Sequence, residues 1–179
     1  IAVADELRPE SGEAIRRLKE LGIETAMLSG DRQVVADRVA AEIGIDEPLG
    51  DLLPDAKVDR IRVLAGKGKI GMVGDGVNDA PALALADVGI AMGGRGTDQA
   101  LETADVVLMA DRLLDVPYAV ELARRMRRVV RQNLVFAGGV IVTLAVLTLF
   151  DKVPLPLGVV GHEGSTIIVT MNGLRLLRR

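Results

Sequence analysis

The chain has 179 residues, with no cysteine, two Phe, one Tyr and no Trp. The lack of cysteine excludes a disulfide framework, a cysteine-ligated zinc site and a thiol nucleophile. So few aromatic side chains argue against a stacking surface for single-stranded nucleic acid. The net charge of −3 conceals a division: residues 1–120 carry −9 (13 Lys and Arg, 22 Asp and Glu), and residues 121–179 carry +6 (9 and 3). The sequence therefore predicts an acidic first part joined to a basic, apolar second part.

Short apolar runs and helical stretches alternate along the first part. Helices are expected at 9–21, 33–43, 54–65 and 79–86, a helical turn at 98–103, and strands at 1–4, 23–28, 69–73, 88–92 and 106–109. Gly22, Gly44 and Gly66 follow three of the expected helices, where glycine commonly ends a helix. This alternation is typical of an α/β domain with a parallel sheet between layers of helices. In such domains the functional groups gather at the carboxyl ends of the strands.

Polar residues follow three of these strands, and the richest group follows the third. That group is the run Gly-Asp-Gly-Val-Asn-Asp at 74–79, which places Asp75 and Asp79 four residues apart. Mg²⁺ takes oxygen ligands and usually keeps waters and substrate phosphates, so paired carboxylates at a sheet edge suit it. The alternative is a surface turn, because Asp and Gly both favour turns.

Two weaker signals accompany this run. Ser29, Gly30 and Asp31 lie between a strand and a helix, where a hydroxyl and free N–H groups form an anion site. A plain helix cap by Ser or Asp is at least as good an explanation of the same residues. Lys57 lies in the first turns of a helix, where it either neutralises a phosphate or is simply solvated.

The second part predicts a hairpin of two membrane helices. Residues 134–150 contain no charged side chain, and a charged link follows at 151–152. The second apolar stretch, 153–174, is broken only by His162 and Glu163. A spanning helix needs about 20 apolar residues, with ~17 as the lower limit. A basic helix over 112–132 is expected to run into the first span. The alternative is a pair of buried core helices.

Arginines flank this hairpin on the side where both of its ends lie. They are Arg124, Arg125, Arg127, Arg128 and Arg131 before the first span, and Arg175, Arg178 and Arg179 after the second. Positive flanks stay on the cytoplasmic side, so we expect an integral membrane protein with its domain and both hairpin ends in the cytoplasm. The membrane that we expect is the bacterial plasma membrane. The basic residues bracket the spans instead of forming a stripe on the domain, which argues against a nucleic-acid partner.

His162 and Glu163 lie near the middle of the second stretch. Ionisable groups at bilayer depth are costly and usually mark an ion path, although a lone histidine is often only a satisfied core residue. An imidazole nitrogen beside a carboxylate suits Zn²⁺ or Co²⁺, and no cysteine or methionine cluster favours Cu⁺.

Several of these segments resemble the P-type ATPases. GDGVNDAPALALADVGIAMG at 74–93 resembles the family's hinge motif, and its phosphorylation domain is similar to VADELRP at 3–9, MLSGD at 27–31 and PDAKVDRI at 54–61. GHEGST at 161–166, with NGLRLL after it, resembles the last span of the heavy-metal (class IB) cobalt/zinc/cadmium subgroup. The resemblance implies a haloacid-dehalogenase-like (Rossmann-type) fold, a Mg²⁺ cofactor, and ATP-driven export of Zn²⁺, Co²⁺ or Cd²⁺ through an aspartyl phosphate.

The resemblance also implies roles for individual residues. Those that handle the phosphoryl group are Ser29, Gly30, Asp31, Lys57, Asn78 and Asp79. Those that bind Mg²⁺ are Asp75 and Asp79. Those at the hinge to a nucleotide domain are Asp5 and Arg8. Those on the path of the transported metal are His162, Glu163, Ser165 and Thr166.

By the same resemblance, residues 1–115 are the C-terminal part of the phosphorylation domain, and 116–179 are a connecting helix with two spans. The chain has no Asp-Lys-Thr-Gly-Thr run, which contains the family's phosphorylated aspartate. We therefore expect a C-terminal fragment, inactive alone, whose partners are the upstream part of the pump, ATP, the metal ion and the bilayer. The upstream nucleotide domain would bind most of the ATP. Two other hypotheses stay open: a membrane-anchored phosphatase of the same fold, and a non-catalytic partner subunit.

Overall fold

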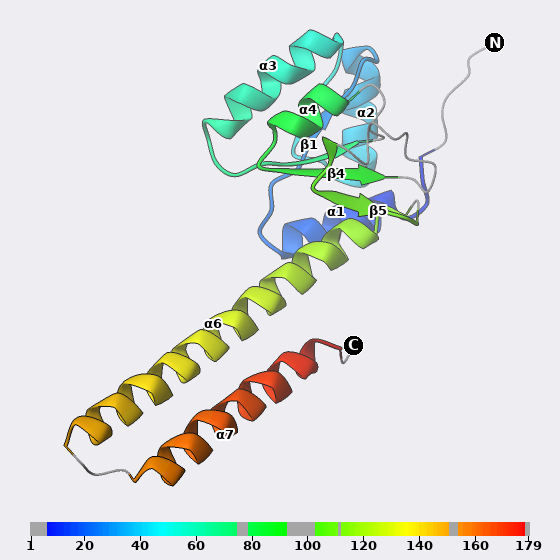
Figure 1. Ribbon diagram of the computed structural model, residues 1–179. Helices are drawn as coiled ribbons and strands as arrows, with labels where there is room; N and C mark the ends of the chain where they lie inside the picture. The colour runs from blue at the N-terminus through cyan, green and yellow to red at the C-terminus, as the bar shows by residue number, and fades with distance from the viewer. Residues whose placement is uncertain (1–6, 75–78, 93–102, 111, 151–153, 178–179) are drawn as a thin grey trace. The chain divides into compact units, whose positions relative to one another are not determined.

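The computed structural model contains two compact units, Ile1–Ala119 and Val120–Arg179 (Figure 1). The residues that it describes are 7–74, 79–92, 103–110, 112–150 and 154–177.

The first unit alternates helices and strands, as the sequence predicts. Its elements are α1 (Ser11–Glu20), β1 (Ala26–Leu28), α2 (Gln33–Ile43), β2 (Glu47–Leu49), α3 (Pro54–Ala65), β3 (Gly71–Gly74), α4 (Ala80–Leu85), β4 (Val88–Met92), β5 (Val106–Leu108) and the start of α6 (Asp115–Leu149). Strand β2 is an addition to the predicted elements. The strand expected at 1–4 and nearly all of the turn expected at 98–103 lie outside the described residues.

Every strand pair in the described part of the chain is parallel. β1 pairs with β2, and β3, β4 and β5 form a second sheet in that order. Helix α4 packs on β3 and β4, and α3 packs on α4. A Cβ atom on Gly89 would lie 2.8 Å from the carbonyl oxygen of Leu83, so glycine at this position lets α4 approach β4 closely. The parallel α/β architecture is therefore confirmed.

The core of this unit is built from small and aliphatic side chains. The fully or almost fully buried ones include Ala14, Ala36, Ala40, Ile61, Ala82, Leu83 and Ala91. Alanine on the inner face of α1 and α2 allows these helices to pack against each other without an aromatic residue. The low content of aromatic residues thus agrees with a core in which small side chains let the helices pack closely.

A carboxylate ties α1 to the strands that follow. Asp46 accepts a 2.6 Å contact from Lys19 Nζ, and its Oδ2 accepts hydrogen bonds of 2.9 Å from both the backbone N–H and the hydroxyl of Thr25. The Lys19 ammonium, followed by the Thr25 donors, lowers the pKa of Asp46 from its ordinary value of 3.8 to about 2. The end of α1 is thereby held to the start of β1 and β2.

The second unit is a helical hairpin. Helix α6 continues without a break to Leu149, so the predicted basic helix and the first predicted span are one element. Helix α7 (Leu155–Leu174) returns beside it and ends in a 3₁₀ turn, η1 (Arg175–Leu177) (Figure 1). The helices meet closely where a Cβ on Gly161 would lie 3.5 Å from Leu144 Cδ2.

Polar side chains join the two helices near the end of α7. Asn172 Nδ2 donates to Asn133 Oδ1 at 2.8 Å, and Asn133 Nδ2 donates to the carbonyl oxygen of Val169 at 3.3 Å. These bonds fix which level of α6 faces which level of α7.

Within the part of the chain that the structure describes, only α6 is long and apolar enough to cross a membrane. Its most apolar 18-residue window has a mean hydropathy of 1.9, and none of that window is buried. Helix α7 has the length of a span, but His162, Glu163 and Asn172 lower its hydropathy. The predicted hairpin is therefore confirmed in part: both helices form, and one meets the criterion for a membrane span.

Candidate functional site

Two of the predicted site residues form an ion pair. Lys57 Nζ donates to Asp79 Oδ1 at 2.9 Å, and the side chains are only 19% and 17% exposed. Lys57 lies in the first turns of α3, which begins after the extended residue Leu53, and Asp79 directly precedes α4. The fold thus brings together two charged groups from motifs that are 22 residues apart in the sequence.

Glycine at the end of β3 makes room for this carboxylate. A Cβ atom on Gly74 would lie 2.9 Å from the Cβ of Asp79 and 3.0 Å from its Oδ2. The Asp79 side chain therefore lies directly over the last residue of the strand. This is the carboxyl end of a parallel strand, where α/β proteins bind their ligands.

The loop after β1 is held by hydrogen bonds at Ser29. The Ser29 N–H donates to the carbonyl oxygen of Leu49 at 2.9 Å, and the Leu52 N–H donates to the carbonyl oxygen of Ser29 at 3.0 Å. The Ser29 hydroxyl donates to Asp31 Oδ2 at 2.9 Å and accepts from the Asp31 N–H at 3.1 Å. These bonds connect the loop to the segment that follows β2.

The plain helix-cap interpretation of Ser29 and Asp31 does not hold. The residue at the N-cap of α2 is Arg32, which makes no side-chain cap hydrogen bond. The Gln33 N–H, in the first turn of α2, donates instead to Asp51 Oδ2 at 3.0 Å. Asp51 has a positive φ of 53°, and its own N–H donates to the carbonyl oxygen of Asp31. The side chains of Ser29 and Asp31 therefore bond to their own loop.

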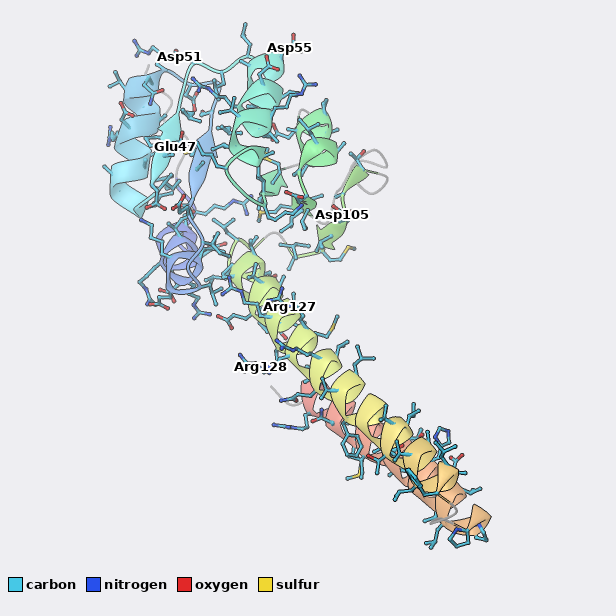
Figure 2. All side chains as sticks on the ribbon, turned by 90° about the vertical axis from the view of Figure 1, so that its left-hand side faces the viewer. Glu47, Asp51, Asp55, Asp105, Arg127 and Arg128 are labelled. Carbon is cyan, nitrogen blue, oxygen red and sulfur yellow. The ribbon has the colours of Figure 1, made fainter. Side chains whose placement is uncertain are left out.

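Gln33, Gly50 and Asp51 form a clasp between the two loops, which we call the loop clasp. Gly50 N–H donates to Gln33 Oε1 at 2.7 Å, and Gln33 Nε2 donates to the carbonyl oxygen of Pro48 at 3.1 Å. In Figure 2, Asp51 lies at the same end of this unit as Asp55 in the first turn of α3. The clasp was not predicted from the sequence, because the position of Gly50 and Asp51 depends on β2, which was not predicted either.

The remaining predicted residues of the first unit are less informative. Asp5, Asp75 and Asn78 lie outside the described residues. The carbonyl oxygen of Arg8 accepts a 3.0 Å hydrogen bond from the Ser11 N–H at the start of α1. Among the described residues, no hydrogen bond or ion pair joins the Ser29 loop to the Lys57–Asp79 pair. The unit therefore has two local groups of predicted residues, each well ordered by its own contacts.

The predicted metal-path residues lie together on α7. His162 and Glu163 are exposed, and Ser165 is buried. The Ser165 hydroxyl donates to the carbonyl oxygen of His162 at 2.6 Å, and the Thr166 hydroxyl donates to the same oxygen at 3.3 Å. No group of three or more His, Cys, Asp or Glu side chains that could hold a metal ion occurs in the described ranges. A metal ion at His162 and Glu163 would thus need further ligands from beyond these residues.

Comparisons with known proteins connect both units to one family. Residues 1–87 match the model of the haloacid dehalogenase-like hydrolases, which confirms the predicted fold. The zinc-transporting ATPase of Bacillus subtilis is 51% identical over 99% of this chain and 28% of its own length. A probable cadmium-transporting ATPase of Listeria monocytogenes is 47% identical over 99% of this chain and 25% of its own length.

A solved structure agrees with these relatives. The crystal structure of a zinc-transporting PIB-type ATPase matches 97% of this chain and 28% of its own chain, with 42% identity and a TM-score of 0.89. Over nearly its whole length, the chain is therefore similar to one segment of the heavy-metal P-type ATPases. It spans about a quarter of the length of these P-type ATPase relatives. The predicted resemblance to this family is confirmed, and the relatives named above are described as metal-transporting ATPases.

Proposed function

We propose that this chain is part of an ATP-driven pump that exports Zn²⁺, Co²⁺ or Cd²⁺ through an aspartyl-phosphate intermediate. The observation that carries this proposal is that the similarity to a zinc-transporting ATPase extends through 99% of the chain. The matched region includes both the α/β unit, with Lys57 and Asp79, and α7, with His162 and Glu163. One polypeptide thus contains groups for phosphoryl transfer and groups for a metal cargo.

In this proposal, the end of β3 is where the phosphoryl group is handled. The Lys57 ammonium, held by Asp79 at 2.9 Å, offsets the negative charge of the phosphoryl oxygens. Carboxylate oxygen is the donor that Mg²⁺ prefers, so Asp79 fits the cofactor, with Asp75 and Asn78 as its neighbours in the motif. Mg²⁺, when bound, would further neutralise the phosphoryl group. Ser29, Gly30 and Asp31, positioned by the loop clasp, would contact its oxygens.

Two strands of the described sheets, β1 and β3, have an edge at which a further strand could pair. Among the described residues, β1 pairs only with β2, and β3 pairs only with β4. We propose that the strand carrying the phosphorylated aspartate comes from the upstream part of the pump and pairs at these edges, since unpaired backbone groups at a sheet edge accept a further strand. Residues 1–115 would then be one part of a phosphorylation domain whose nucleotide domain binds most of the ATP. Asp5 and Arg8 would lie at the hinge between them.

The hairpin would carry the cargo path. We place residues 116–179 as a basic connecting helix and two spans of the bacterial plasma membrane, with both ends in the cytoplasm. His162 and Glu163 supply nitrogen and oxygen donors that suit Zn²⁺ or Co²⁺. Ser165 and Thr166 support the same turn of α7 through the carbonyl oxygen of His162.

The cargo path is tested by substitution in the full-length protein. His162→Ala and Glu163→Ala should each weaken activation of ATP hydrolysis by Zn²⁺, Co²⁺ and Cd²⁺ by more than about 10-fold, because groups that merely orient a ligand already change metal affinity by about 10–100-fold. Thr170→Ala is the matched control, since its hydroxyl bonds to the carbonyl oxygen of Thr166 in the same helix. Unchanged metal activation in both substituted proteins would remove these residues from the path.

The phosphoryl site is tested separately by comparing the substitution of two lysines, one in the site and one outside it. Lys57→Ala should slow formation or hydrolysis of the phosphorylated enzyme by about 100-fold, the usual effect of losing one electrostatic stabiliser. Lys69→Ala removes a lysine that also pairs with a carboxylate, Asp87, but is 91% exposed. Equal phosphorylation kinetics in the two variants would contradict the role assigned to Lys57.

A further inference from the structure

Arginines gather on one face of α6, just before its apolar part. Arg124, Arg127, Arg128 and Arg131 recur at the spacing i, i+3, i+4, i+7, which places them along one side of a helix. Asn133 lies on the side that contacts α7. Nine residues, about two and a half helical turns, separate Arg124 from Asn133, so the two point to opposite sides of α6. The arginine face is therefore turned away from α7.

Three of these arginines have no acidic partner among the residues that the structure describes. Arg127, Arg128 and Arg131 are exposed, and none of them makes an ion pair within the described part of the chain. Figure 2 labels Arg127 and Arg128 on α6. On other helices of this chain exposed arginines do find carboxylates, as Arg62 does with Asp59 at 3.0 Å. Arg127, Arg128 and Arg131 thus present positive charge that no carboxylate among the described residues neutralises.

The hairpin contact sets the level of this charge. Arg131 lies two residues before Asn133, and Arg175 on α7 lies three residues after Asn172, so the Asn133–Asn172 contact at 2.8 Å brings both arginines to one level. Arg175 Nη1 also donates to Asn172 Oδ1 at 3.1 Å. Beyond Asn133, residues 134–149 of α6 carry no charged side chain. The arginines of both helices therefore end where the apolar surface begins.

We propose that Arg127, Arg128, Arg131 and Arg175, which we call the arginine belt, bind the phosphates of anionic phospholipids in the cytoplasmic leaflet. Basic clusters next to a spanning helix attract anionic lipid headgroups, and the planar guanidinium group binds phosphate through two parallel hydrogen bonds. The unneutralised charge matches an anionic ligand, and its place beside the apolar surface selects a lipid over a soluble one. The inference rests on the membrane orientation proposed above.

The test uses the full-length protein in nanodiscs of phosphatidylcholine with phosphatidylglycerol. The retained phosphatidylglycerol is counted by native mass spectrometry. Each arginine near the surface contributes about fivefold to headgroup binding, so Arg127→Gln/Arg128→Gln should lower the preference for phosphatidylglycerol by about 25-fold. Arg38→Gln/Arg60→Gln is the matched control, because it removes two exposed arginines from the α/β unit. Arg127→Lys/Arg128→Lys should retain part of the preference, since lysine keeps the charge but loses the bidentate geometry.

Equal retention of phosphatidylglycerol by the unsubstituted protein and the α6 glutamine variant overturns the proposal, as does an equal loss in the control variant. Unchanged lipid retention with a lower melting temperature in lipid-free detergent also overturns it, since the arginines would then bind an acidic protein segment. Lipid retention is measured without metal or ATP. A protein that holds phosphatidylglycerol but shows no metal-stimulated ATPase would therefore contradict the pump proposal and support the lipid site.

Discussion

Gly50 in the loop clasp gives the sharpest prediction for the α/β unit. In Gly50→Ala the new Cβ would lie 2.6 Å from Gln33 Cα, 2.7 Å from Gln33 N and 2.9 Å from the carbonyl oxygen of Asp31. All three neighbours are backbone atoms, so relief requires the start of α2 to move away from the loop after β2. Overpacking of this kind costs about 1–3 kcal/mol, and loss of the 2.7 Å bond from Gly50 N–H to Gln33 Oε1 adds about 1 kcal/mol.

This cost would appear as local opening of α2. At about 2 kcal/mol, the lower part of that range, hydrogen exchange of the α2 amides should be about 30-fold faster. The measurement is hydrogen exchange with mass spectrometry on the peptide covering residues 33–43 of the full-length protein. Gly12→Ala in α1 is the control: a Cβ there meets no heavy atom within 4 Å, so the change should leave α2 unaffected. Exchange rates in Gly50→Ala within twofold of the parent protein would refute the reasoning.

Three further predictions concern other contacts. Because the pKa of Asp46 in the folded protein lies below its ordinary value, the ionised carboxylate stabilises the fold fully above about pH 4, and this stabilisation is lost as the pH falls towards 2. In Asp46→Asn, the free energy of unfolding should therefore depend less on pH within that window. A double-mutant cycle with Asn133→Ala and Asn172→Ala, measured by unfolding in detergent, should give a coupling free energy of about 0.6 kcal/mol and no more than ~1.7; zero coupling would contradict a stabilising role for the hydrogen bond between these two side chains. Gly44 ends α2 with a φ of +83°, so Gly44→Ala should lower the unfolding free energy by about 1–2 kcal/mol, and a stabilised variant would contradict this.

The sequence predicted the helices of the first unit well because residues next to each helix end determine where it begins and ends. α2 and α3 have the predicted bounds, and glycine follows each of them. Strand β4 is also as predicted, since five apolar and glycine residues in a row favour a buried strand. By contrast, β2 is only Glu47–Leu49 and contains a proline, so nothing in its own composition indicates a strand. It exists because β1 pairs with it.

The same distinction separates the predicted site residues from the missed ones. Lys57 and Asp79 each stand in a motif that points to phosphate chemistry, and the structure places them in contact. Gln33, Gly50 and Asp51 have no such motif. Their role comes from contacts between two loops that are far apart in sequence, and the position of the second loop depends on β2. Because the composition of β2 does not predict its pairing with β1, the residues whose contacts depend on that pairing could not be predicted either.

Three hydroxyl groups of α7 find their hydrogen-bond partners within the helix itself. The carbonyl oxygens of α7 accept the hydroxyl hydrogens of Ser165, Thr166 and Thr170, so these groups need no partner on another helix. The end at Asn172, however, is fastened to α6. Because these hydroxyl bonds lie within α7, they are kept whatever surface packs against the rest of the helix.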